Sequence, residues 1–105
     1  MIYKLPDQSN LYGTIFNVES KKALANMFEA NGWRVNKSTW TNYEVRTDWI
    51  EIIIENEEHN PLIHGLIDPT MFDHFRRFLD SSRLKYSLEL YNDEGKLIKE
   101  EKTRN

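Results

Sequence analysis

Three histidines and two aspartates between residues 59 and 74 are the side chains best suited to do chemistry in this chain. They are His59, His64, His74, Asp68 and Asp73. Imidazole and carboxylate groups together can bind a metal ion or transfer protons. Their spacing matches neither the HxH nor the HExxH pattern, and each histidine falls in a different predicted element. We therefore expect structural or solvent-facing roles for them, and the sequence indicates no metal and no other cofactor.

A second group of candidate residues is acidic and lies at the tip of a predicted hairpin. Glu55 ends one strand, over 49–55, and Glu57 and Glu58 follow it before another strand, over 62–67. No Asp-rich ligand spacing with a loop glycine accompanies them, so a calcium loop is not indicated. The carboxylates could meet a basic cleft on a partner, or they could simply keep the tip solvated.

Aromatic residues form the third group. Trp33, Trp40, Tyr43 and Trp49 fall within seventeen residues of one another. On an uncovered sheet face they would act as binding anchors, because Trp and Tyr dominate interface energetics. They could equally fill the core of a small domain. We expect Trp33 in the core, whereas Trp40 and Trp49 fit either place.

Helical periodicity predicts two helices, each with one apolar stripe. The first begins at an N-cap, Ser20, runs to Asn31 and ends at Gly32. The second begins at Asp68, which can cap a helix whose first residue is Pro69, and continues to about residue 82.

Alternating residues predict the strands that must position these groups. The expected strand segments are 11–18, 33–47 with an interruption near 36–38, 49–55, 62–67, 84–91 and a charged edge strand at 96–101. The order βαβββαββ predicts an α+β two-layer sandwich. It consists of a mostly antiparallel sheet of about five or six strands with both helices on one face. In strand 49–55, Ile50, Ile52 and Ile54 should meet the helices. Glu51, Ile53 and Glu55 should then share the other face with Trp49.

Strand 62–67 has two faces that the pattern does not distinguish. Alternation assigns Leu62, His64 and Leu66 to one face and Ile63, Gly65 and Ile67 to the other. If the isoleucines pack inward, His64 lies on a partly exposed stripe beside the acidic tip; otherwise it is buried and hydrogen-bonded. Gly65 favours the first arrangement, because a position without a side chain lets a helix approach closely.

Length and composition limit the protein class. We expect one α+β domain over 1–105, with 1–10 and 102–105 irregular or frayed. The absence of cysteine excludes disulfides and cysteine-bound zinc. Without an apolar signal core or a membrane-spanning run, we expect a cytoplasmic protein that does not enter membranes.

Residues 55–80 hold six acidic and two basic side chains, a balance of −4 in a chain of net charge −3. This balance disfavours nucleic acid and favours a basic protein partner.

The function that these patterns favour is a small protein-binding module that is not an enzyme. Its most concrete form is an inhibitor or immunity protein that neutralises a basic toxin or nuclease, with carboxylates steering a cationic site and aromatic anchors holding it. The expected partner-binding residues are Glu51, Glu55, Glu57, Glu58, His64, Trp40, Tyr43 and Trp49. The same face could also serve a homodimer.

Two alternatives stay open. The first is an accessory domain for single-stranded nucleic acid or a small ligand, which would stack on the aromatic residues of 40–49 beside nearby basic side chains. The second is a small enzyme that uses His64 or His74 with a neighbouring carboxylate.

Overall fold

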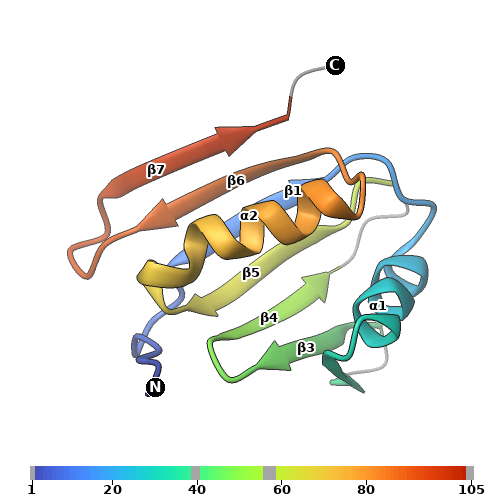
Figure 1. Ribbon diagram of the computed structural model, residues 1–105, viewed down its shortest axis with the longest axis horizontal. Helices are drawn as coiled ribbons and strands as arrows, with labels where there is room; N and C mark the ends of the chain where they lie inside the picture. The colour runs from blue at the N-terminus through green and yellow to red at the C-terminus, as the bar shows by residue number, and fades with distance from the viewer. Residues whose placement is uncertain (1, 39–40, 56–58, 104–105) are drawn as a thin grey trace.

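Seven segments with strand-forming residues pair into one antiparallel sheet, and two helices cover one of its faces (Figure 1). The computed structural model describes residues 2–38, 41–55 and 59–103. The strands are β1 Leu11–Ile15, β2 Arg34–Lys37, β3 Tyr43–Thr47, β4 Ile50–Glu55, β5 Leu62–Ile67, β6 Tyr86–Tyr91 and β7 Leu97–Lys102. Their order across the sheet is β2-β3-β4-β5-β1-β6-β7. The predicted α+β class and antiparallel sheet are confirmed. The sheet exceeds the predicted size because segment 33–47 forms two strands.

The first helix, α1 Lys21–Ala30, begins where the sequence predicts. The Ser20 side chain accepts a hydrogen bond from the Ala23 backbone N–H at 3.0 Å, which satisfies a donor that has no partner within the helix. Gly32 then adopts a φ of 88°, the left-handed conformation that reverses the chain after a helix. The chain turns directly into β2.

The second helix starts with a 3₁₀ turn, η1 Pro69–Met71, which continues into α2 Phe72–Ser81. Asp68 caps it as predicted, because its Oδ1 accepts hydrogen bonds from the Thr70 backbone N–H at 2.9 Å and the Thr70 hydroxyl at 2.7 Å. Its Oδ2 accepts from the Lys4 backbone N–H at 3.0 Å. The hydrogen bond from Lys4, followed by those from Thr70, lowers the pKa of Asp68.

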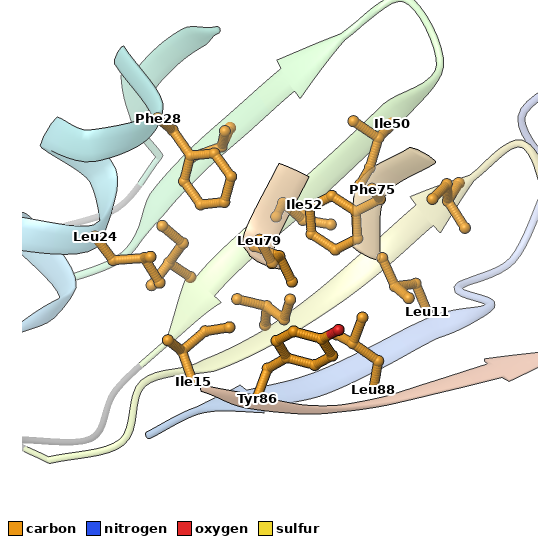
Figure 2. Packing of buried hydrophobic residues seen from close by; sticks show 14 of the residues in the cluster. Leu11, Ile15, Leu24, Phe28, Ile50, Ile52, Phe75, Leu79, Tyr86 and Leu88 are labelled. Carbon is orange, nitrogen blue, oxygen red and sulfur yellow. The ribbon is translucent and has the colours of Figure 1, made fainter. Parts of the chain in front are cut away.

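The core lies between the helices and the sheet (Figure 2). The Ile residues of β4 at 50, 52 and 54 are fully buried, as alternation predicts. Phe28 of α1 and Phe75 and Leu79 of α2 point down onto the sheet in Figure 2. On β6 the predicted inward residues Tyr86, Leu88 and Leu90 are also buried. Burial of this continuous apolar layer is the main term that holds the helices on one face.

Gly65 is required by the neighbouring strand. A Cβ at this position would lie 2.1 Å from the Glu51 carbonyl oxygen and 2.8 Å from the Ile52 Cα. Ile63 and Ile67 are buried, which is the arrangement that Gly65 favoured among the two left open, but the physical reason differs. The glycine makes room for the backbone of β4, and a helix does not occupy the space.

Residues 2–10, before β1, form no helix or strand, yet the last of them is fixed. Asn10 is 5% exposed, and its side chain forms two 2.9 Å hydrogen bonds with the backbone N–H and C=O of Ile67. At the other end β7 continues through Lys102, and the Thr103 N–H donates to the Tyr86 carbonyl at 3.0 Å. Strand pairing therefore extends further than the frayed end expected from residue 102. Within the described residues, neither helix has the length and apolar character needed to cross a bilayer.

Candidate functional site

The sheet face that the helices leave uncovered carries three of the five predicted contact residues that the structure describes, Glu51, Glu55 and His64; we call it the open face. Because successive side chains alternate between faces, burying the isoleucines of β4 places Glu51, Ile53 and Glu55 here. Cross-strand pairing then aligns one residue from each strand into a central row. The row runs Asn36, Glu44, Ile53, His64, Tyr12, Glu89 and Glu100.

His64 lies in the middle of this row, which answers the question that alternation left open. It is half-buried between its cross-strand partners Ile53 and Tyr12. Its Nε2 lies 2.9 Å from Glu55 Oε1, and its ring stacks on that of Tyr12 with centroids 6.4 Å apart. Of the two arrangements left open, His64 therefore takes the one beside the acidic residues, and it contacts Glu55 directly on the open face.

The aromatic residues of the open face differ from those that the sequence analysis selected. Tyr12 is 41% exposed and meets Tyr91 edge-on, with ring centroids 5.5 Å apart. Sequence reasoning missed both as contact residues. A signal was available, since alternation in 84–91 correctly placed Tyr91 outward. The tryptophans were chosen as contact residues instead, because they lie close together in the sequence.

The prediction that Trp49 shares the open face is wrong. Trp49 lies in the turn between β3 and β4, and its ring packs beside Trp33, Phe75 and His74 at centroid distances of 5.4, 6.4 and 5.3 Å. These contacts place it on the helix side of the sheet. Alternation does not extend through a turn, so counting back from Ile50 assigned the wrong face.

Tyr43 also lies on the helix side, which corrects its predicted place on the aromatic open face. It packs partly buried against the core, on the same side of β3 as the fully buried Val45. Glu44 and Arg46 occupy the opposite side. Trp33 is buried at 8% exposure, as predicted. The predicted contact residues Trp40, Glu57 and Glu58 lie outside the described residues.

Carboxylates outnumber cations on the open face. Pairing places here the acidic residues Glu44, Glu51, Glu55, Glu89 and Glu100 and the basic residues Arg34, Arg46 and Lys102. Arg46 is the direct cross-strand partner of Glu51, whereas Glu89 and Glu100 are direct partners of each other. Like charges directly opposite one another disfavour the sheet. A positive group from outside would relieve this repulsion.

Three shallow hollows mark this face, and Tyr12, His64 and Glu89 each line two of them. A hollow of about 510 Å³ includes Glu55, Leu62 and Glu100, and a smaller one of about 330 Å³ includes Glu51 and Ile53. The largest, about 740 Å³, lies between residues 5–10 and the β6–β7 turn; we call it the N-terminal cleft. The open face is therefore hollowed rather than flat.

The three histidines do not converge. His59 is exposed in a bend, and His74 is exposed on α2 with its ring against Trp49. Within the part of the chain that the structure describes, no group of three or more His, Asp or Glu side chains is arranged to hold a metal ion. The His64–Glu55 contact of 2.9 Å supplies the imidazole–carboxylate pair that the enzyme alternative requires.

Comparisons with protein families, curated proteins and solved structures find no match to this chain.

Proposed function

We propose that this protein is a protein-binding module whose open face binds a basic protein surface. Its most concrete form is an inhibitor or immunity protein that neutralises a basic toxin or nuclease. The observation that carries the proposal is the composition of the open face, where Tyr12 and Tyr91 lie among carboxylates that outnumber nearby cations.

Electrostatics and aromatic anchors have separate roles in this proposal. Clustered carboxylates raise the rate of encounter with a cationic partner and exclude acidic ones. Exposed Tyr12 and Leu62 then supply apolar area that is removed from water in the complex. Exposed carboxylates alone would favour only a loose, salt-sensitive association. The combination is typical of a specific interface with a hydrophobic centre and a charged rim.

The open face is large enough for this role. The molecule measures 33 × 31 × 23 Å, and its two long dimensions lie in the plane of the sheet in Figure 1. A standard interface covers roughly 800 Å² on each partner, which a face of these dimensions accommodates. The uncovered sheet can therefore serve as a docking surface without a change in fold.

The nucleic-acid alternative has less support from the geometry. It requires a stacking platform made from the aromatic residues of 40–49, but Tyr43 and Trp49 lie on the helix side, packed against the core. Tyr12 and Tyr91 could stack bases instead. However, Glu89 is the cross-strand partner of Tyr12 and would repel the phosphates that accompany a base.

The test uses the intact protein to capture its partner, which is then purified for quantitative titration. We compare Glu55→Lys, on the open face, with the matched control Glu29→Lys, exposed on α1. Both variants change the net charge equally. Glu55→Lys should raise the Kd at least about tenfold, because it places a cation opposite a basic partner, whereas Glu29→Lys should stay within about twofold.

Two further results bear on this proposal. The affinity for wild-type protein should fall as the salt concentration rises, because screening weakens attraction between exposed charges. An inhibitor should also abolish the activity of the captured protein at a one-to-one ratio. Equal binding by Glu55→Lys and Glu29→Lys, together with salt-independent affinity, would overturn the proposal.

A second candidate function rests on the 2.9 Å contact between His64 and Glu55, in which a carboxylate orients an imidazole as a general base. The test is turnover of ester, phosphodiester and peptide substrates. Activity that is lost in both His64→Gln and Glu55→Gln, and kept in Glu29→Gln, would support an enzyme. Equal turnover in all three variants would exclude this role for the pair.

A further inference from the structure

The N-terminal cleft combines aromatic rings with carboxylates. Tyr12 and Tyr91 line it from β1 and β6, and their rings meet edge-on at 87°. Asp7, Glu89 and Asp93 also line it, from the N-terminal segment, β6 and the β6–β7 turn respectively. None of the lining residues among those that the structure describes is a lysine or an arginine. The cleft is thus a negatively charged hollow with an aromatic wall.

Glu89 is the carboxylate of this cleft that faces a second carboxylate across the sheet. It lies directly opposite Glu100 on β7, and the ion pairs found within residues 2–38, 41–55 and 59–103 include neither carboxylate. The nearby Tyr91 reflects the same environment, because burial and then the Glu89 carboxylate raise the pKa of its hydroxyl. An incoming cation at Glu89 would be attracted by both Glu89 and Glu100.

We infer that the N-terminal cleft binds the guanidinium group of an arginine from the partner, with the group on Glu89 and against the rings of Tyr12 and Tyr91. This inference rests on the proposed function, since it names the anchor by which the open face recognises a basic protein. A planar guanidinium forms two parallel hydrogen bonds with a carboxylate and also stacks on aromatic rings. A lysine ammonium offers neither geometry and holds its water more strongly.

The walls of the cleft match this occupant. Residues 5–10 form one side, and this segment is fixed at its end, because the Asn10 side chain is hydrogen-bonded to the backbone of Ile67 and its carbonyl accepts from the Tyr91 N–H at 2.8 Å. A volume of about 740 Å³ accommodates an arginine side chain together with the residues that flank it. Two sides of the cleft are therefore anchored, by the paired strands β1 and β6 and by Asn10.

The test is an NMR titration of the intact protein, carrying ¹⁵N and ring-labelled tyrosine, with three capped tripeptides. They are Gly-Arg-Gly, Gly-Lys-Gly and Gly-citrulline-Gly, the last of which keeps the shape of arginine without its charge. The arginine peptide should shift the ring signals of Tyr12 and Tyr91 and the amide of Gly95. The lysine peptide should bind more weakly, and the citrulline peptide should produce no saturable shift.

Variants identify the residues that bind the peptide. Glu89→Gln should weaken binding of the arginine peptide about tenfold, because it removes the charged acceptor, and Tyr91→Leu should also weaken it. Glu29→Gln on α1 is the matched control and should bind as wild type does. An unchanged spread of amide signals shows that each variant is folded. Equal shifts with the arginine and citrulline peptides, or unaltered binding by both folded variants, would overturn the arginine site.

The outcomes separate this inference from the proposed function. If the peptides do not bind but Glu55→Lys still weakens the captured partner, the arginine site is wrong and the basic partner stands. If the arginine peptide binds at Tyr12 and Tyr91 but Glu55→Lys and salt leave partner affinity unchanged, the cleft stands and the wider acidic interface is wrong.

Discussion

The two faces of the sheet contain residues from the same strands but obey different physical constraints. On the covered face of β4, Ile50, Ile52 and Ile54 are sealed under the helices. On the open face, Ile53 alternates with two carboxylates that water can reach. The side chains of the covered face have to fill the space under the helices, and those that are buried there are hydrophobic. The open face is free of that demand, and its mixture of rings and charges is therefore the more informative part of the molecule about function.

The largest effect that tests this contrast comes from two neighbouring isoleucines. Ile52→Ala removes buried methyl groups and should lower the free energy of unfolding by about 2–5 kcal/mol, because the cavity collapses only partly. Ile53→Ala, on the open face, should cost less than about 1.5 kcal/mol, since its side chain is only partly buried. Urea denaturation of both variants provides the measurement.

The binding data should show the reverse order. Ile53→Ala is expected to weaken the captured partner, whereas folded Ile52→Ala should bind normally. Equal losses of stability in the two variants would show that the open face is covered in the native protein, for instance by a second copy of the chain.

An intermediate effect concerns Asp68, a polar group at the helix layer. Asp68→Ala removes the cap of the second helix and should cost about 0.5–2 kcal/mol at neutral pH. The pKa of Asp68 is lowered by folding, so its contribution is fully present above the unfolded value of 3.8 and is lost as the pH falls through the lower folded value. The stability difference between wild type and Asp68→Ala should therefore shrink in acid.

The control for Asp68 is Asp93→Ala, exposed in the β6–β7 turn, which should alter the free energy of unfolding by less than about 0.5 kcal/mol. Urea midpoints measured from pH 7 to pH 2 would follow both variants. A difference for Asp68→Ala that stays constant across this range would show that the carboxylate charge does not contribute to the cap.

The smallest expected effect is a gain in stability on the open face. Glu100→Gln relieves the repulsion with Glu89 directly across β6 and β7 and should stabilise the protein by about 0.2–1 kcal/mol. The same change should weaken the captured partner, because it removes negative potential beside the arginine site. A variant that is less stable and binds equally well would contradict the assignment of this pair to binding.

Much of the fold was predictable because its determinants are local. Ser20 and Asp68 cap helices through side chains that reach donors only two or three residues away. The alternation of β4 and β6 separated buried from exposed positions before any partner strand was known. The number of strands was harder to predict, since segment 33–47 divides into β2 and β3 after Lys37, and the expected interruption near 36–38 overlaps residues that pair within β2.

The candidate site was predictable only in part. Glu51 and Glu55 were correctly placed on the open face because they follow strand alternation, whereas alternation left the face of His64 undecided. Trp49 was misplaced because its orientation is set by the rings of Trp33 and Phe75, which are distant in sequence. Tyr12 was not predicted as a contact residue, because its neighbours His64 and Glu89 come from strands that are distant in the sequence.

Local chemistry thus determined where helices start, which residues of each strand share a face and how negative the middle of the chain is. Only the tertiary structure decided that His64 faces away from the helices, because it is Ile63 and Ile67 of the same strand that are buried in the core. It also brought Asp7, Tyr12, Glu89 and Asp93 to one cleft. Pairing between strands that are distant in the sequence brings such residues together. The periodicity within one segment does not indicate which other strand will pair with it.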